Sequence, residues 1–457
     1  MFNKRYKTIY DTIHKYIYIS DIAARIIDTP EFQRLRNLKQ LGTACYAFPT
    51  ADHTRFVHSI GTYHLAGRML NSIRELSNSE HIDNCMMKIP QLSDYYANRC
   101  IYGNKLDDYV IELIKIAGLC HDIGHGPYSH VFDDVFLQGA NNRNTHEYRS
   151  ALIIDKIIKR DSVLRNMICD DDITFIKSLI DPTYEDRGFV YQIVSNNVNG
   201  IDVDKFDYIT RDSFYIGISN FDFTRFVTDA RVINNMICYP HQLAYDIYRM
   251  YMTRYSLHKQ MYNHKAVIAA QLMICDIMKL ADKTMNISNS IGNMASFTRL
   301  TDNYINNVID YMRYNDDCND DIRQAGMILD RLNSHDLYYM FDSITSDKPI
   351  TITIDMITKH PEYNYDDAIT SKIRIYTNKI GYVSGNKQNP FDNIMGYWPK
   401  KLNNDMADSK MIKSEDITYM MSDRYQEYMA MFYYTDRNNE SVIKHLAYIV
   451  KSLTSSC

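Results

Sequence analysis

The stretch IAGLCHDIGHGPYSH, residues 116–130, places three histidines and an aspartate directly after an apolar segment. Neutral imidazole and carboxylate groups are standard ligands of divalent metal ions, and histidine also transfers protons near neutral pH. His121 and Asp122 are adjacent, and adjacent helical side chains point about 100° apart, so both can reach one ion beside the helix. A capped surface helix can end in the same pair. The stretch alone therefore leaves a metal site and a plain helix end open.

Polar side chains at helical spacing occur in four further segments. Some lie at i and i+3 on one face of a helix, and one stripe interrupts an otherwise apolar helix at i, i+3 and i+7. A solvated surface would explain their charges, but not their place among apolar neighbours. The chain contains metal-binding residue types in the order His…His-Asp…Asp. They can bind one ion only if the tertiary structure brings them together. The residues are Arg55 and His58; His146 and Glu147; Asp204, Lys205, Tyr208 and Asp212; and Arg254, His258 and Tyr262.

Helices must position most of these residues. Thr29-Pro30 predicts a helix start with an N-cap and a first-turn proline, and apolar residues recur along it to Leu41 at three-residue steps. The polar segment 76–107 is expected to be a long loop or insertion. Gly124, Gly126 and Pro127 stop the helix that carries His121. Further helices are expected at about 54–73, 107–121, 146–160, 202–215, 221–235 and 244–284, with two more between 293 and 333.

The pattern of apolar and polar residues changes after about residue 333. The segments 350–357 (ITITIDMI) and 372–378 (KIRIYTN) alternate with β-branched residues and predict strands. A turn is expected at 384–390, and helix again at 411–454. The predicted fold is therefore mainly α, with a helical core over residues 1–333 and a smaller α+β part over 334–457.

The amino-acid composition indicates which partners and which cellular location to expect. The 457 residues are 45% hydrophobic and 23% charged with a net charge of −5, so binding to nucleic acid is possible but not indicated. The nine cysteines are scattered, which favours a reducing, cytoplasmic location over a disulfide framework. The first residues do not form a signal peptide, and no apolar run is long enough to span a membrane, so no membrane partner is expected.

The sequence resembles the HD-domain hydrolases, and most closely the deoxynucleoside triphosphate triphosphohydrolases of the animal sterile-alpha-motif-and-HD-domain type. The resemblance extends from about residue 7 to 333 and more loosely beyond. The sterile-alpha-motif domain itself is expected to be missing, because the HD part begins almost at Met1, and the insertion near 77–107 looks longer than in that family. The stretches that carry it are IIDTPEFQRLRNLKQLG (26–42), FPTADHTRFVHSIGTYHLAG (48–67), IAGLCHDIGHGPYSHVFD (116–133), NGIDVDKFDYITRD (199–212) and TRYSLHKQMYNHK (253–265).

The resemblance implies hydrolysis of dNTPs to deoxynucleoside and tripolyphosphate, which would lower dNTP pools. It assigns one divalent metal ion (Fe, Mn, Zn or Mg) to His58, His121, Asp122 and Asp204, and it allows additional Mg with the triphosphate. The implied catalytic cluster is His125, His130, His146, Asp133 and Glu147. The implied substrate-binding residues are Gln40, Leu41, Arg55, Lys205, Tyr208, Asp212, Arg254, His258 and Tyr262.

The chemistry of these residue types fits such a reaction. A triphosphate needs arginine and lysine, and the 5′-oxygen that leaves needs a proton, which histidine can give. His130, oriented by Asp133 or Glu147, is the expected acid. His53 and His64 are expected to be ordinary packed or surface histidines. Two alternatives remain: another HD-type nucleotide phosphohydrolase or phosphodiesterase, and a non-catalytic descendant that binds nucleotide or single-stranded nucleic acid.

The resemblance also implies allosteric nucleotide sites and a homo-oligomer, dimer or tetramer, with GTP or dGTP as a possible activator. The guanine-selective site is matched by Lys7, Asp28, Gln33 and Arg36, and the adjacent dNTP site by Arg225, His264 and Lys265. This sequence departs from the family at Tyr10, where the family has asparagine, and at Pro240 and Gln242, where it has basic residues. We therefore expect guanine nucleotides to bind, with weak coupling of a second dNTP to assembly.

Overall fold

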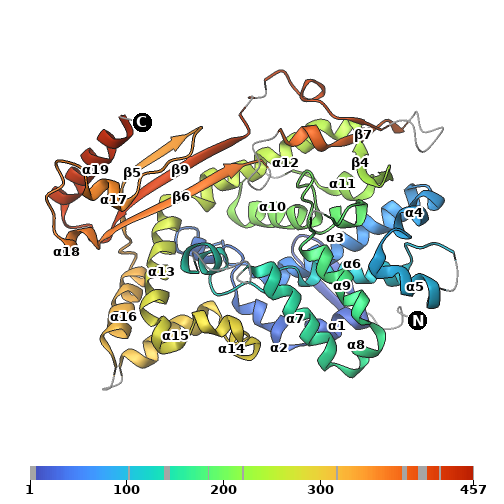
Figure 1. The fold of residues 1–457 in the computed structure, drawn as a ribbon, viewed down its shortest axis with the longest axis horizontal. Coiled ribbons are helices and arrows are strands. Elements are labelled where there is room, and N and C mark those ends of the chain that lie inside the picture. The colour runs from blue at the N-terminus through green and yellow to red at the C-terminus, as the bar shows by residue number, and fades with distance from the viewer. Residues whose placement is uncertain are drawn as a thin grey trace.

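Helices form most of the molecule, and the described residues contain three small sheets (Figure 1). The predicted fold class, mainly α with a helical core and a smaller strand-containing C-terminal part, is confirmed. No helix in the described ranges is both long and apolar enough to cross a membrane. The computed structural model describes residues 7–100, 103–137, 145–183, 185–218, 221–314, 318–382, 389–399, 409–420, 422 and 424–455.

Three helices form the centre of the molecule. Helix α3 (Arg55–Leu76) packs against α6 (Asp108–Cys120) and α10 (Val203–Ile216). Asp107 and Asp202 cap the N-termini of α6 and α10, where their carboxylates accept backbone N–H groups. Such a cap contributes about 1 kcal/mol to helix stability. The predicted metal-binding and phosphate-binding residues all lie on or next to these three helices, apart from Arg254.

Sixteen further helices surround this centre in the described residues. They are α1 (Asp21–Ile27), α2 (Pro30–Gln33), α4 (Ser79–Met86), α5 (Ser93–Asn98), α7 (His146–Arg160), α8 (Ser162–Met167), α9 (Asp170–Ile180), α11 (Thr224–Thr228), α12 (Ala244–Leu257), α13 (Lys265–Met285), α14 (Met294–Phe297), α15 (Asp302–Arg313), α16 (Asp320–Asn333), α17 (Ile354–Thr358), α18 (Asp367–Thr370) and α19 (Glu440–Ser455). Of the 3-10 and π segments, four matter below: η1 (Arg34–Asn37), η2 (Gly42–Tyr46), η4 (Val131–Phe136) and η8 (His258–Tyr262).

The strands form one hairpin and two larger sheets. The hairpin pairs β1 with β2 in antiparallel register. The second sheet has the order β3-β4-β7-β8, and its β4–β7 pair is parallel. The third has the order β5-β9-β6, and α19 packs against it. The strands are β1 (Lys7–Asp11), β2 (Lys15–Ile19), β3 (Arg231–Ile233), β4 (Met236–Pro240), β5 (Tyr339–Ser346), β6 (Ile373–Gly381), β7 (Met395–Tyr397), β8 (Ser409–Met411) and β9 (Gln426–Tyr434).

Two predictions for the N-terminal half are wrong. Thr29 caps a helix as expected, but α2 is only one turn and continues as the 3-10 segment η1. Apolar residues at three-residue steps fit the three residues per turn of a 3-10 helix better than an α-helix. The expected loop at 76–107 instead contains α4 and α5, because Asn78 caps α4 and its apolar residues face the core.

Four later expectations also need correction. The expected helix at 221–235 stops at Thr228 and gives way to β3 and β4, joined by two asparagines with positive φ. The helix at 244–284 is interrupted by the π segment η8. The strand expected at 350–357 is wrong because Thr353 caps α17, and 411–454 contains β9 as well as α19. The strand at 372–378 is confirmed, and most of the predicted turn at 384–390 lies outside the described residues.

Candidate active site

A cavity of about 790 Å³ lies between the helical centre and strand β6. All of the predicted substrate-binding residues line it, together with most of the predicted metal and catalytic residues. Of the predicted set, His58 and Asp133 do not line the cavity and are buried, with side chains 0% and 7% exposed. The structure therefore brings residues from widely separated segments of the chain to one place.

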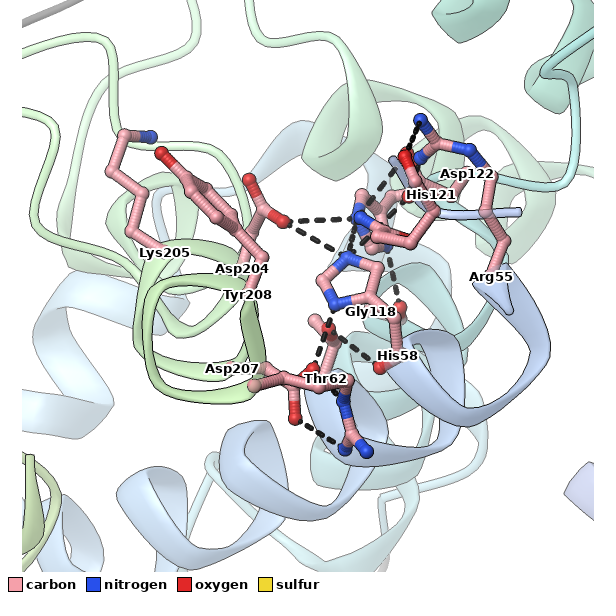
Figure 2. A network of polar contacts seen from close by, with 12 residues as sticks. Arg55, His58, Thr62, Gly118, His121, Asp122, Asp204, Lys205, Asp207 and Tyr208 are labelled. Carbon is pink, nitrogen blue, oxygen red and sulfur yellow. Dashed lines mark hydrogen bonds and ion pairs between the residues drawn. The ribbon is translucent and has the colours of Figure 1, made fainter. Parts of the chain in front are cut away.

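The four predicted metal ligands converge at one end of the cavity (Figure 2). His58 Nε2 lies 3.3 Å from His121 Nε2 and 3.1 Å from Asp204 Oδ1. Asp122 lies 3.4 Å from the same His58 nitrogen and 3.5 Å from that of His121. Two imidazole nitrogens and two carboxylates at this spacing form a donor set that suits a divalent cation such as Fe, Mn or Zn.

The Nδ1 atoms of His58 and His121 each have a hydrogen-bond partner as well. His58 Nδ1 lies 2.8 Å from Asp207 Oδ2, and His121 Nδ1 lies 2.8 Å from the carbonyl oxygen of Gly118. A proton on Nδ1 donates to these acceptors, which leaves the Nε2 lone pair directed at the shared centre. Metal-binding histidines are oriented by such contacts in general. The residues present therefore fit a bound ion.

The electrostatics of this end favour positive charge. Burial disfavours the charged form of His58, but hydrogen bonds to Asp204 and Asp207 outweigh it and raise the His58 pKa to about 10. Burial likewise opposes ionisation of Asp204, yet the two histidines hold its pKa far below the usual range. Arg55 forms an ion pair with Asp122, whose pKa is also lowered. The carboxylates that favour positive charge on these histidines would equally favour a metal cation between them.

The loop after His121 is held in a strained conformation. Tyr128 and Ser129 both have φ of 58°, which is uncommon for residues other than glycine and marks strain that surrounding contacts must hold. Ser129 Oγ accepts from Arg55 Nε at 2.9 Å and donates to the carbonyl of Lys39 at 2.8 Å.

A Cβ atom on Gly124 would lie 2.2 Å from the carbonyl oxygen of His146, so this glycine permits close packing on α7.

The predicted catalytic histidines gather beside the metal ligands. The rings of His125 and His146 stack with centroids 3.8 Å apart, and Asp133 lies 3.6 Å from His125 and 3.5 Å from His146. His146 also lies 3.2 Å from Glu147. His130 is 65% exposed, and its Nδ1 is 3.2 Å from Asp134 rather than from Asp133 or Glu147, the partners expected from the sequence.

Cations line the wall next to this cluster. Arg254 Nε donates to the hydroxyl of Tyr208 at 3.1 Å, and Lys205 Nζ lies 2.8 Å from Asp202. With Arg55, these side chains give the cavity three cations close to the metal ligands. Arginine and lysine in such a place suit a polyanion.

The cavity is also lined by polar groups of another kind. The Tyr262 hydroxyl donates to Asp212 Oδ2 at 2.6 Å, and His53 Nε2 lies 2.8 Å from Asp212 Oδ1. Gln40 Oε1 and His258 Nδ1 are buried and have no hydrogen-bond partner among the described residues. Buried polar atoms are normally paired, so these two are available to bind a molecule that enters the cavity.

Comparisons with known proteins agree with this site. The HD domain family matches residues 55–211. An HD domain-containing protein of Acanthamoeba polyphaga mimivirus is 42% identical over 84% of this chain and 83% of its own length. The deoxynucleoside triphosphate triphosphohydrolase SAMHD1 homolog of Dictyostelium discoideum is 33% identical over 93% of this chain and 76% of its own, and bovine SAMHD1 is 32% identical over 93% and 74%. The chain belongs to the SAMHD1-like family of HD-domain proteins.

This SAMHD1-like chain is therefore an HD-superfamily phosphohydrolase by descent. Its matched domain runs from the start of α3 to Arg211 within α10, so it contains all four predicted metal ligands. The chain covers about three quarters of the length of the two SAMHD1 relatives. The family accounts for a divalent metal site, but not for the identity of the ion.

The residues predicted for allosteric nucleotides lie outside the cavity. Lys7 forms a 2.7 Å ion pair with Asp28, and both are about half exposed. Gln33 accepts from Arg36, whose guanidinium lies 3.6 Å from the ring centroid of Phe56. Arg225 pairs with Asp229, His264 caps α13, and Lys265 is exposed at the start of that helix.

Sequence reasoning missed several residues of this SAMHD1-like site. Asp207 is a buried partner of His58, although it lies in the segment that supplied Asp204. His53, expected to be an ordinary histidine, holds Asp212. Tyr376 and Asn378 on β6 line the cavity from the C-terminal part. Spacing could have flagged Asp207, three residues after Asp204, but no pattern places β6 beside α12.

Proposed function

We propose that this chain hydrolyses dNTPs to the deoxynucleoside and tripolyphosphate. One observation carries the proposal: a single cavity is lined by three of the four metal-ligand residues and three cations, and also by the Asp212–Tyr262 pair and by Gln40, whose side-chain oxygen has no partner among the described residues. The metal ligands and cations suit a polyphosphate, and the Asp212–Tyr262 pair and Gln40 suit a sugar hydroxyl. The family relationship supports the same substrate class, since the Dictyostelium and bovine relatives are named as dNTP triphosphohydrolases.

The residues of the cavity would have separate roles in phosphate binding, proton donation and sugar binding. Arg55, Lys205 and Arg254 would bind and orient the phosphates, since arginine and lysine match their charge. His130, accessible from the cavity and next to Asp134, would give a proton to the departing 5′-oxygen. Asp212 would accept a hydrogen bond from the 3′-hydroxyl. A divalent ion at the quartet, when bound, supplies Lewis-acid activation of water.

Product analysis tests the proposal directly. The purified chain is incubated with each dNTP and Mn²⁺, and the products are separated by anion-exchange and reversed-phase chromatography. Equimolar deoxynucleoside and tripolyphosphate are expected. Asp204→Ala should abolish both products and the bound metal, whereas Asp320→Ala, at an exposed site on α16, should change neither. Release of deoxynucleoside monophosphate, or activity only on monophosphates or cyclic nucleotides, would favour another HD phosphohydrolase reaction.

A further inference from the structure

A buried network of charges lies behind the metal-ligand quartet. It consists of Asp207 and Arg211 on α10 and of Asp11 and His14 at the turn between β1 and β2. The four side chains are between 0% and 3% exposed. Figure 2 shows Asp207 on the side of His58 away from His121 and Asp122. The network therefore joins the N-terminal hairpin to a metal ligand.

Each member of the network is held by the next. Asp207 Oδ2 lies 2.8 Å from His58 Nδ1, and its Oδ1 lies 2.6 Å from His14 Nε2. Arg211 donates to both oxygens of Asp207, each at 2.9 Å, and to Asp11 at 2.8 Å. Asp11 also accepts the backbone N–H groups of Ile13 and His14 at 2.8 Å. The turn is thus fixed by the same carboxylates and guanidinium that fix His58.

The surface of α3 is shaped to admit this network. Gly61 lies one turn after His58, and a Cβ atom there would be 1.9 Å from Asp207 Oδ1 and 2.8 Å from an Arg211 nitrogen. A methyl group would therefore displace the carboxylate from its place against the helix. This is an observation independent of the hydrogen bonds, and it points to the same role for Asp207.

We infer that Asp11 and His14 are positioning residues for the metal site, and that hairpin docking and metal binding stabilise each other. His14 and Arg211 hold the Asp207 carboxylate so that it accepts the Nδ1 proton of His58 and leaves Nε2 free for the ion. Losing such an outer contact typically costs about 10–100-fold in metal affinity. The effect must be reciprocal, because coupling free energies are shared between two sites. The inference rests on the proposed metal site, but not on the substrate.

The first test compares two substitutions of His14. His14→Ala removes the donor to Asp207, whereas His14→Gln retains an N–H donor that can reach it. Mn²⁺ affinity of the full chain is measured by competition with a fluorescent chelator, which needs no substrate. We expect His14→Ala to bind Mn²⁺ about 10–100-fold more weakly, His14→Gln to recover much of that loss, and kcat to fall with little change in KM. Unchanged Mn²⁺ affinity in His14→Ala would overturn the inference.

The second test uses two glycines of the same helix. Gly61→Ala should weaken Mn²⁺ binding, whereas Gly67→Ala should not, because a Cβ atom there meets only the flexible chain of Lys115 at 3.1 Å. Circular dichroism and size-exclusion chromatography identify a variant that fails to fold.

Hydrogen exchange on the unmodified chain tests the reciprocal effect without any variant. Saturating Mn²⁺ should slow exchange of the Ile13 and His14 amides, by up to about 10–100-fold if opening of the turn breaks the network. Amides of α19, far from the network in Figure 1, should not respond. Equal exchange of the turn with and without Mn²⁺, when Mn²⁺ binding is itself detected, would refute the coupling. An inactive chain that still binds Mn²⁺ and shows this protection would instead contradict only the proposed dNTP hydrolysis.

Discussion

At the scale of single residues, His130 differs from the other histidines near the cavity in being mostly exposed and paired only with Asp134 among the described residues. A general acid must reach the departing oxygen, and the exposed ring of His130 has more freedom to do so than the ring of His125, which is 1% exposed. His130→Ala should therefore retain bound metal and nucleotide but lose about two to four orders of magnitude in kcat. Single-turnover kinetics with dGTP and metal analysis provide the measurements. Unchanged kcat with a raised KM would make His130 a phosphate ligand instead.

The sugar end of the cavity predicts discrimination against ribonucleotides. Leu41 is apolar, and the hydroxyl of Tyr262 is already committed to Asp212. A ribose 2′-hydroxyl placed between them would be buried without a partner, which costs about 1–3 kcal/mol. The ratio kcat/KM should then be about 5- to 150-fold higher for dGTP than for GTP. Equal kcat/KM values for dGTP and GTP would show that the cavity does not discriminate against ribonucleotides.

The predicted quartet and the predicted cations of the cavity came from the family resemblance rather than from residue types and spacing alone, and the structure brings these residues together. Neither the resemblance nor the spacing predicted the partners of these residues. Asp134 rather than Asp133 faces His130, because η4 has π-helical geometry and each residue points elsewhere than on an α-helix. His53 looked like an ordinary packed histidine, since its role depends on Asp212, 159 positions away. Such partners follow from tertiary contacts that local spacing does not contain.

At the scale of elements, Asp302 links the first turn of α15 to two loops of the site. Its buried carboxylate accepts the backbone N–H groups of Lys39 and Tyr128, and burial raises its pKa to about 6. An unfolded aspartate titrates near pH 4, so the native state binds this proton more tightly. The contribution of Asp302 to stability is therefore fully present below about pH 4 and falls by up to roughly 3 kcal/mol as pH rises to about 6.

Asp302→Asn should remove this pH dependence. Relative to the unmodified chain, the melting temperature of the variant should increase between pH 4 and pH 7, because the variant has no carboxylate to ionise. Differential scanning calorimetry across this range measures it, and Asp320→Asn, 87% exposed, is the matched control. A constant difference in melting temperature between Asp302→Asn and the unmodified chain would contradict the shift.

The elements that sequence patterns predicted best are α3, α6, α7 and α10, and the last three begin at residues whose side chains cap the helix. The patterns failed where the helical period changes. Arg254, His258 and Tyr262 looked like one stripe, yet η8 winds with a hydrogen bond from Asn263 N to the carbonyl of His258, five residues back. Because this turn is wider than an α-helical turn, the side chains of His258 and Tyr262 point in different directions from those they would have on an α-helix. The Asn234–Asn235 turn was missed although two such residues favour a hairpin.

At the scale of the whole molecule, the C-terminal part contributes to the site in a way that its sequence does not reveal. Strand β7 pairs with β4, and β6 supplies a wall of the cavity through Tyr376 and Asn378. Asn378 donates to Asn263, which follows the η8 segment, at 2.8 Å. Such pairings join segments more than 100 residues apart, and alternation of residue types predicts strands without predicting their neighbours. The boundary near residue 333 remains a prediction.

Assembly is the property for which we propose a departure from the animal relatives. Lys7, Asp28, Gln33 and Arg36 lie together on the surface, where Asp28 could accept from a guanine edge and the cations could meet phosphates. A surface ion pair would look the same in the absence of nucleotide.

The second nucleotide site that the resemblance implies would carry less positive charge in this chain. Tyr10 is 61% exposed on β1, and neither Pro240 nor Gln242 supplies a cation. We therefore expect guanine nucleotides to bind while a second dNTP couples weakly to assembly, so that the chain is active as a pre-formed dimer or larger oligomer. Light scattering and activity, each with and without GTP plus a non-hydrolysable dNTP, measure both properties. A monomer that becomes an active tetramer only when both nucleotides are added would show that these substitutions do not have this effect.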